Sequence, residues 1–449
     1  MLYQGFVQRL LSHTKDSTRL VLALSGGLDS RVLLHLLARF KSEYPQYDYL
    51  SVHVHHGLSD NADQWLQQCQ YWSQQADIPF VAEKVQIELG SGISLEQAAR
   101  TARYQALSQH LNPSSLLLTA HHQSDQLETF LLALKRGSGP KGLSAMAMDG
   151  KFEFARLLRP VLDVSRADML AYANHHQLDW IEDESNRDTR FDRNFIRHQV
   201  TPILRQRWPN IEKTVARSAA LCAQQESLLN ELLYERYKQM CSEDGALSVS
   251  LLQEQSEAAR GAILRLWLQE QGFLMPSAKQ LLQIWQDVAL AQADAAPVFR
   301  YGNTHIGRHQ QQLWVFNSMQ DISANVLDWD IKQPLTLPDG LGCLELKARN
   351  ELEFFDTTSL AASSIQTLSL PVGYNQIKVK FSATGIHAHP QDRQHGRSLK
   401  KLLQEYQIPT WQRQRIPFLV DGSELIVAAG LFVGKPYSGA DYQLIWHKK

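Results

Sequence analysis

The segment with the clearest chemical potential is SGGLDS, which runs from Ser25 to Ser30. It follows a short apolar run, Leu20–Leu24, and precedes a helical pattern of apolar residues. Adjacent glycines let successive backbone N–H groups point at one anion, and the start of a helix adds the positive end of its dipole. We therefore predict a phosphate-binding loop made of Ser25, Gly26, Gly27, Leu28, Asp29 and Ser30.

Asp29 indicates a metal ion at this loop. A carboxylate repels phosphate, so its presence beside a phosphate site implies a bridging magnesium ion. The loop matches neither GxxxxGK[ST] nor GxGxxG, so it is neither a Walker A loop nor a dinucleotide fingerprint. An ordinary Gly-Gly turn capped by serine is the alternative, but the strand, the spacing and the helix together favour the phosphate loop.

A second polar cluster lies in AHHQSDQLETFLL, residues Ala120–Leu132. Asp125 and Glu128 are three positions apart, so they share one face of the predicted helix and are suited to hold magnesium or an ammonium group. Asp29 and Asp125 are the predicted metal ligands. His122 is a candidate to accept a proton or to contact a base. The alternatives are a first helical turn whose acids favour the dipole, and a histidine hydrogen-bonded at a strand end.

The elements that must position these residues alternate regularly. Fully apolar strands that alternate with helices predict an α/β fold with a doubly wound parallel sheet. Ligands of such folds bind at the carboxyl ends of the strands, where both polar clusters fall. The predicted strands are 20–24, 49–55, 80–87 and 116–119, and the helices include 61–76 and 94–110.

The later part of the chain has a different pattern. Residues 211–293 are helical, and 298–316 predict a hairpin that turns at Gly302-Asn303. Short strand patterns, a helix at 398–406 and a hairpin turn at Asp421-Gly422 predict a small α+β domain at the end. We expect a catalytic domain at 1–215, a mainly helical substrate domain at 216–316, a linker with marginal strands at 317–365 and the α+β domain at 366–449.

Composition indicates a globular protein of several domains, since 449 residues exceed one ordinary core and the chain is 44% hydrophobic. The longest apolar stretch, Leu425–Val433, is far shorter than the ~20 residues that cross a bilayer. The first residues do not form a secretory signal, so we expect a cytoplasmic protein without a membrane partner. Cys69, Cys222, Cys241 and Cys343 are too scattered for a disulfide framework or a cysteine metal cluster.

SGGLDS between a strand and a helix resembles the loop of the PP-loop ATP pyrophosphatase superfamily. The resemblance implies that ATP is the co-substrate and is cleaved between its α and β phosphates, leaving AMP on an oxygen of the second substrate. Further motifs resemble the bacterial tRNA(Ile)-lysidine synthase family over essentially the whole chain. They are HVHHGLS from His53, GISLEQAARTARYQAL from Gly92, the Ala120–Leu132 segment, KRGSGPKGLSAM from Lys135, RP at Arg159 and WIEDESNRDTRFDRNFIR from Trp180.

This resemblance implies a ligase that joins L-lysine to the wobble cytidine of the CAU anticodon of tRNA(Ile). The cytosine oxygen attacks the α-phosphorus, and the lysine amine then displaces AMP from the ring carbon. The family reaction needs a cation to neutralise phosphate charge, for which Arg103 is preferred and Arg100 is the alternative. His53 is expected beside the nucleotide. The sequence departs from the family at Ser124, where many members have an acidic residue next to the one at the position of Asp125. We therefore assign the role of this acidic pair to Asp125.

Two basic segments are the candidate RNA contacts. Residues 186–217 carry eight Lys/Arg against three Asp/Glu, and residues 393–417 carry six against one. Pairing with nearby acids, or a solvated basic face, is the alternative in each case. The candidates are Arg187, Arg190, Arg193 and Arg197, which recur at near-helical spacing, and Arg397, Lys400, Lys401, Arg413 and Arg415, which surround Trp411.

Two other functions stay open from the sequence. A small-molecule amide synthetase of the same superfamily would not need the long C-terminal half with its basic segments. A non-catalytic RNA-binding protein would not need the complete set of Gly26, Gly27, Asp29 and Asp125. The oligomeric state is also open, and a homodimer is one possibility.

Overall fold

The computed structural model describes residues 2–448 except 16, 58, 88–94, 293–294, 349–362, 372–373 and 375. The start of the motif at Gly92 and part of the predicted linker lie outside the described residues. The chain divides into two compact units, Met1–Glu231 and Leu232–Lys449. In the described part of the chain, no helix is both long and apolar enough to cross a membrane.

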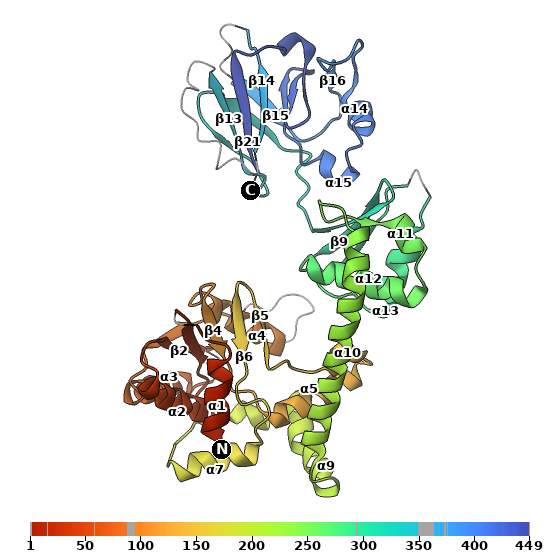
Figure 1. Cartoon of the computed structure of the whole chain (residues 1–449). Coiled ribbons are helices and arrows are strands. Elements are labelled where there is room, and N and C mark those ends of the chain that lie inside the picture. The colour runs from red at the N-terminus through yellow and green to blue at the C-terminus, as the bar shows by residue number, and fades with distance from the viewer. Residues whose placement is uncertain are drawn as a thin grey trace. The chain divides into compact units, whose positions relative to one another are not determined.

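The first unit is built on a six-stranded sheet with the order β3-β2-β1-β4-β6-β5. Figure 1 labels β2, β4, β6 and β5 in this sheet. All neighbours are parallel except β5 and β6, which form an antiparallel pair. The strands are β1 Arg19–Ala23, β2 Asp48–His55, β3 Phe80–Lys84, β4 Ser115–Leu118, β5 Asp149–Phe152 and β6 Ala155–Leu158. The predicted α/β fold with a parallel sheet is confirmed, with an antiparallel edge strand that was not predicted.

Helices cover both faces of this sheet. They are α1 Leu2–Leu11, α2 Leu28–Glu43, α3 Ala62–Gln75, α4 Leu95–Ser108, α5 Gln123–Lys135, α6 Pro140–Leu143 and α7 Arg166–His175. Alternate residues of β1 point to opposite cores, because side chains alternate along a strand. Leu20 and Leu22 lie in one core with Phe40 of α2, and Val21 lies in the other with Leu107 of α4.

The strand order changes direction beside β1. The chain runs outward from β1 to β2 and β3, and then returns to place β4 on the other side of β1. Ligands of open α/β sheets bind at such a switch point, at the carboxyl ends of the strands. The SGGLDS loop follows β1 and the Ala120–Leu132 segment follows β4, so the topology brings the two predicted polar clusters together.

Short helical segments follow α7 before one long helix begins. They are the 3-10 helix η1 Glu184–Arg187, α8 Asp192–Phe195, the π-helix η2 Ile196–Val200 and α9 Thr201–Arg207. Helix α10, Ile211–Met240, has 30 residues and continues into the second unit. The changes of helix type interrupt the regular periodicity that the spacing of the arginines had predicted.

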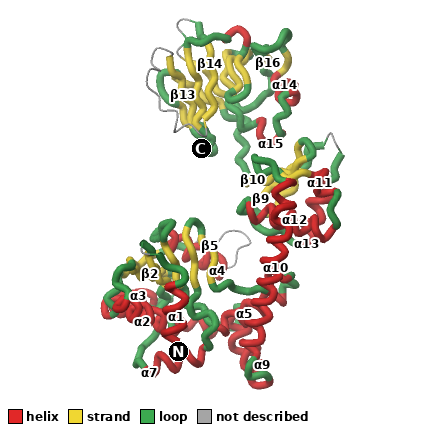
Figure 2. Tube along the Cα trace, viewed as in Figure 1, coloured by secondary structure: helices red, strands yellow, loops and turns green. Residues whose placement is uncertain are grey.

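Helices dominate the first part of the second unit, around α12 and α13 (Figure 2). They are α11 Val249–Gln253, α12 Glu257–Glu270, α13 Ala278–Gln283 and η3 Ile284–Ala289, beside strands β7 Leu247–Ser248, β8 Val298–Tyr301, β9 Thr304–His309 and β10 Gln312–Asn317. The single predicted hairpin is in fact two. Gln310 and Gln311 form the second turn with φ of 49° and 59°, and such a pair is not a recognisable turn signature.

Strands dominate the rest of the second unit (Figure 2). They are β11 Val326–Asp330, β12 Leu335–Thr336, β13 Cys343–Ala348, β14 Ser363–Leu368, β15 Gln376–Lys380, β16 His387–Ala388, β17 Arg397–Ser398, β18 Phe418–Asp421, β19 Glu424–Ala428, β20 Phe432–Val433 and β21 Tyr442–His447, with α14 Leu399–Glu405, α15 Thr410–Arg413 and the 3-10 helix η6 Lys435–Tyr437. The predicted helix and the predicted turn at Asp421-Gly422 are confirmed.

The segment predicted as a linker with marginal strands, 317–365, contributes strands to the C-terminal sheets in its described residues. Strand β11 pairs with β15, and β13 pairs with β21, so both belong to the sheets of the C-terminal part. Trp329 and Leu344 are buried in its core. The acidic composition concealed these strands, because Asp328 and Asp330 of β11 lie exposed on either side of the inward-facing Trp329.

Candidate active site

The predicted phosphate loop is a tight turn between β1 and α2. Gly26 has a φ of +90°, and a Cβ atom there would lie 2.6 Å from Ile181 Cδ1 and 3.0 Å from Cys69 Sγ. Only glycine fits this position. Gly27 is the N-cap of α2 and makes no side-chain cap, so the first N–H groups of the helix are directed at the place that an anion would take.

Ser30 braces the loop from inside. Its Oγ donates to the carbonyl of Gly27 at 3.0 Å, and it accepts from the Gly26 N–H and from Ser25 Oγ, each at 3.0 Å. Ser30 is buried, whereas Ser25 is exposed. Ser30 therefore shapes the loop, and Ser25 is the better placed of the two hydroxyls to meet a phosphate.

His122 joins the two carboxylates that were predicted as metal ligands. It caps α5: the Ser124 N–H donates to His122 Nδ1 at 3.1 Å, and the His122 N–H donates to Asp125 Oδ2 at 2.9 Å. Because Nδ1 is an acceptor, the neutral ring carries its proton on Nε2. That nitrogen lies 3.4 Å from Asp29 Oδ2 and 3.6 Å from Asp125 Oδ2, so the three predicted residues meet.

Two effects oppose each other on the pKa of His122. Burial lowers it, but hydrogen bonding to Asp29 and the negative charges of Asp125 and Asp29 outweigh burial and raise it. The helix cap works against this rise, because a second proton would sit on Nδ1 and break the hydrogen bond from Ser124. His122 Nε2 thus faces both carboxylates at ion-pair distance, and the role of His122 as a proton acceptor or base contact stays a prediction.

Asp29 has the free oxygen that a cation needs. Its Oδ1 is buried and has no hydrogen-bond partner among the residues that the structure describes, while its Oδ2 lies 3.6 Å from Arg166 Nη1. An unpartnered buried carboxylate oxygen fits a bound cation. The described residues contain no group of three His, Cys, Asp or Glu side chains that would hold a metal alone. Magnesium, which commonly uses one or two carboxylates together with substrate phosphates, suits Asp29 and Asp125.

The charge of Asp125 is held by its surroundings. Burial raises the pKa of Asp125, but its interactions with His122 and His121, the hydrogen bond from the His122 backbone N–H and the guanidinium of Arg193 outweigh burial and hold the pKa below its ordinary range. Asp125 is therefore ionised at neutral pH, as a cation ligand must be.

Glu128 is held by two arginines of the segment predicted to bind RNA. The Glu128 side chain is only 2% exposed. Arg193 Nε donates to it at 3.0 Å and Arg197 Nε at 2.7 Å, and Arg197 also reaches Asp125 Oδ1 at 3.3 Å. Sequence reasoning had assigned these acids and these arginines to different tasks, but the fold joins them in one cluster.

The other two arginines of this segment point outward. The side chains of Arg187 and Arg190 are 82% and 88% exposed. Arg190 pairs with Asp188 at 2.7 Å and Arg187 with Glu182 at 3.7 Å, as the alternative interpretation stated. The near-helical spacing of the four arginines does not place them on one face, because the segment changes from 3-10 to α to π geometry.

Arg103 contributes positive charge near the site. Its guanidinium lies 5.3 Å from the Tyr104 ring, which Arg100 also approaches, at 4.9 Å. Burial lowers the pKa of Arg103, and the charges of Arg100 and Arg193 act in the same direction. No carboxylate among the described residues pairs with Arg103, which is the situation expected of a cation that awaits phosphate. The choice between Arg103 and Arg100 stays a prediction.

His53 supports the start of the loop. It is buried at the end of β2, and its Nδ1 donates to the carbonyl of Leu24 at 2.9 Å. Leu24 directly precedes Ser25, so this bond ties β2 to the entrance of the phosphate loop. The predicted contact between His53 and the nucleotide stays a prediction.

Sequence reasoning missed several residues that surround the site. The Ile181 N–H donates to the carbonyl of Gly26 at 3.0 Å, and Arg205 Nη2 donates to Ser124 Oγ at 2.9 Å. Ile181 lies inside the motif that begins at Trp180, so a signal for it was present. Arg205 has no sequence signal, because its partner is 81 positions away.

Three of the five basic residues proposed for the second unit already have protein partners. Lys400 and Lys401 are exposed, and the described part of the chain offers them no acidic or carbonyl partner. The three partnered residues are Arg397 with Glu405, Arg413 with the carbonyl of Ile408, and Arg415 with Asp339.

Trp411 is used for packing within the second unit. Its ring stacks on Phe316, with centroids 5.0 Å apart and planes at 18°. A Cβ atom at Gly307 would lie 2.6 Å from the Trp411 ring, so the ring rests directly on that backbone. The Trp411 ring is therefore engaged in packing, and its contact with a base or sugar of RNA stays a prediction.

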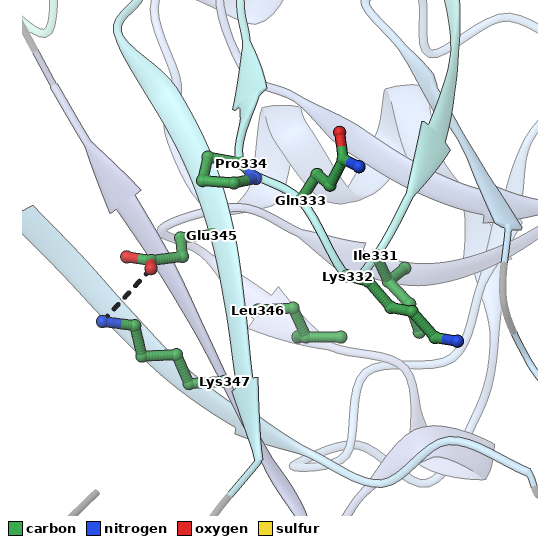
Figure 3. Close-up of a pocket in the computed structure, with 7 residues that line it drawn as sticks. All are labelled: Ile331, Lys332, Gln333, Pro334, Glu345, Leu346 and Lys347. Carbon is green, nitrogen blue, oxygen red and sulfur yellow. Dashed lines mark ion pairs between the residues drawn. The ribbon is translucent and has the colours of Figure 1, made fainter. Parts of the chain in front are cut away.

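A separate hollow of about 220 Å³ lies in the C-terminal part (Figure 3). Figure 3 shows Lys347 and Glu345 side by side, and their charged ends are 3.1 Å apart. This pairing neutralises two of the charges that border the hollow. Its lining residues are Ile331, Lys332, Gln333, Pro334, Glu345, Leu346 and Lys347.

Comparison with known proteins adds whole-chain similarity to this geometry. The PP-loop domain family matches residues 3–204, the TilS substrate binding domain 247–314 and the TilS substrate C-terminal domain 377–446. The tRNA(Ile)-lysidine synthase of Vibrio vulnificus is 48% identical over 447 residues, covering 100% of this chain and 99% of the relative. That of Photobacterium profundum is 48% identical over 446 residues, covering 99% of each.

Similarity to solved structures is weaker. The U34-tRNA thiolase NcsA from Methanococcus maripaludis superposes on 49% of this chain and 80% of its own, with 14% identity and a TM-score of 0.41.

Proposed function

The chain belongs to the tRNA(Ile)-lysidine synthase family, and we propose that it ligates L-lysine to C2 of the wobble cytidine in the CAU anticodon of tRNA(Ile), with ATP as co-substrate. The products are lysidine, AMP and pyrophosphate. The modified tRNA then decodes AUA instead of AUG and is an isoleucine rather than a methionine tRNA. The observation that carries the proposal is the meeting of Asp29, His122 and Asp125 beside a phosphate loop.

The first step joins the cytosine oxygen to the α-phosphorus and releases pyrophosphate. The α2 N–H groups and Ser25 hold the phosphates, and Arg103 neutralises charge as pyrophosphate departs. Asp29 and Asp125 would hold magnesium, which supplies further neutralisation of the phosphate oxygens when it is bound. His122 lies against both carboxylates through Nε2 and helps to hold them in place.

The second step joins the lysine amine to the ring carbon and releases AMP and a proton. Glu128 and Asp125 are the proposed partners of the lysine ammonium before it loses that proton. In this structure Arg193 and Arg197 occupy both carboxylates, at 2.7–3.3 Å. A lysine ammonium must therefore share or replace guanidinium contacts, and phosphates of a bound tRNA are natural competitors for those guanidinium groups.

The remaining assignments are part of the same proposal. The candidates for direct phosphate contact are Lys400 and Lys401, which are exposed, and Arg187 and Arg190, which are more than 80% exposed although they pair with Glu182 and Asp188. We place the enzyme in the cytoplasm, where it would meet its tRNA. The domain boundaries predicted at 215, 316 and 366, and a homodimer, stay predictions.

The test uses the full chain with ATP, labelled lysine and transcripts of tRNA(Ile) and tRNA(Met), which share the CAU anticodon. We expect labelled lysidine in tRNA(Ile) alone, with one AMP and one pyrophosphate per lysidine. ADP as the main product would overturn the proposal. Pyrophosphate release that does not depend on RNA would favour a small-molecule synthetase instead.

A further inference from the structure

Ser124, Arg205 and Glu212 form a chain of contacts that ends at the active-site helix α5. We propose that Arg205 is a positioning residue for the catalytic carboxylates and that Glu212 supplies the negative charge that Arg205 needs. This inference rests on the proposed function, because it concerns how the same site is held.

The contact with Ser124 reaches the catalytic cluster directly. Ser124 is 5% exposed and lies in the first turn of α5. Its Oγ accepts from Arg205 Nη2 at 2.9 Å, while its backbone N–H donates to His122 Nδ1 at 3.1 Å. Arg205 therefore holds the same residue that orients the His122 ring toward Asp29 and Asp125.

One nitrogen of Arg205 makes both of its contacts. Nη2 donates to Ser124 Oγ and also to Glu212 Oε1, which lies 2.5 Å away in the first turn of α10. A terminal guanidinium nitrogen carries two hydrogens, so each contact takes one of them. Because the two hydrogens have a fixed angle between them, the hydrogen bond to Glu212 fixes the direction of the hydrogen that Ser124 accepts. Displacement of Glu212 would therefore break the hydrogen bond from Arg205 to Ser124.

Among the residues that the structure describes, Glu212 is the only acid that pairs with Arg205. Ser124 is neutral, and the side chains of Glu212 and Arg205 are 13% and 40% exposed, so the ion pair is partly shielded from water. An aspartate at position 124 would lie within reach of the same nitrogen and would itself be the counter-ion of Arg205. The geometry therefore predicts that the charge can be moved from Glu212 to position 124.

The experiment compares lysidine formation by wild type, Glu212→Gln, Arg205→Ala and the same two changes combined with Ser124→Asp. We expect Glu212→Gln and Arg205→Ala each to lower kcat about tenfold, as expected for lost positioning, with little change in KM for ATP. Ser124→Asp should return the Glu212→Gln enzyme to within about threefold of wild type. It should not rescue Arg205→Ala, because the rescue needs the guanidinium.

Arg207→Ala is the matched control, since Arg207 lies on the same helix, is exposed and has no partner within the described residues. Thermal unfolding of each variant separates loss of positioning from loss of fold. If Glu212→Gln does not fold, Glu212→Asp takes its place, because it keeps the charge but shortens its reach. Equal activity of Glu212→Gln with and without Ser124→Asp would overturn the inference, as would a wild-type kcat in Arg205→Ala. A wild type that forms no lysidine would instead overturn the proposed function.

Discussion

The carboxyl edge of the first sheet and the basic surface of the second unit were both predicted from short motifs, with different outcomes. At the sheet edge, His122 Nε2 lies 3.4 Å from Asp29 and 3.6 Å from Asp125, as the motifs required. In the second unit, Arg397 and Arg415 are instead bonded to acids of the protein itself. Parallel topology dictates where the loops after β1 and β4 meet, whereas a basic composition does not tell which cations are free.

The largest effect is expected at the sheet edge. Asp29→Ala and Asp125→Ala should each lower lysidine formation by about 10²-fold or more, because each removes a carboxylate that supports charge neutralisation at the phosphates. Filter binding of tRNA should stay near wild type, since the proposed tRNA contacts lie on other residues. Asp29→Asn and Asp125→Asn are the isosteric controls. Near-normal turnover in either alanine variant would contradict the role assigned to that aspartate at the phosphates.

The next effect separates the inward from the outward arginines of one segment. Arg197→Ala should lower the free energy of unfolding by about 3 kcal/mol, because it strips a partner from the buried carboxylate of Glu128. Arg190→Ala should change it by no more than about 0.5 kcal/mol, because the Arg190 side chain is 88% exposed. Urea denaturation measures both. Equal destabilisation by the two variants would contradict the division of the segment into buried and exposed arginines.

A smaller effect tests which cations of the second unit are free. Replacing Lys400 and Lys401 with alanine should weaken tRNA binding and make the slope of log affinity against log salt less steep by about 1.8, if each lysine neutralises one phosphate. Arg397→Ala should change that slope less, because Arg397 is already bonded to Glu405. Binding measured at several salt concentrations gives the slopes. An equal change for Arg397→Ala would mean that paired cations also contact the tRNA.

The smallest effect concerns the helices behind the phosphate loop. His35 of α2 bonds Tyr172 of α7 through Nδ1 at 2.9 Å, and burial, helped by the charges of His176, Arg31 and Arg39, lowers its pKa to about 4. The unfolded chain keeps a histidine pKa near 6.5. As pH falls from about 6.5 to 4, the unfolded chain binds this proton first, so stability decreases.

His35→Gln keeps a hydrogen-bonding group but removes the titration. The melting temperature of this variant should fall less than that of wild type between pH 6.5 and pH 4. His175→Gln, on the same α7 surface but not bonded to Tyr172, is the control. Parallel curves for wild type and His35→Gln would show that His35 does not contribute to acid sensitivity.

Local sequence patterns were sufficient to predict the secondary-structure elements and the phosphate loop of the first unit. Apolar runs and helical periodicity predicted β1, β2, β4 and the helices between them, because these patterns depend on residues close together in the chain. The order of strand and loop then located the site, since parallel strands end at one edge. The same reasoning failed at β11, where one buried tryptophan is surrounded by exposed acids.

Tertiary packing alone determined which residues the charged side chains of the site contact. Arg197 bonds Glu128 from 69 positions away, and Ile181 bonds Gly26 from far outside the loop. These choices follow from desolvation: a carboxylate that folding buries must take the nearest available cation, whatever its distance along the chain. The motifs therefore predicted the residue types of this site. Which acid each arginine binds depended on which surfaces the fold brought together.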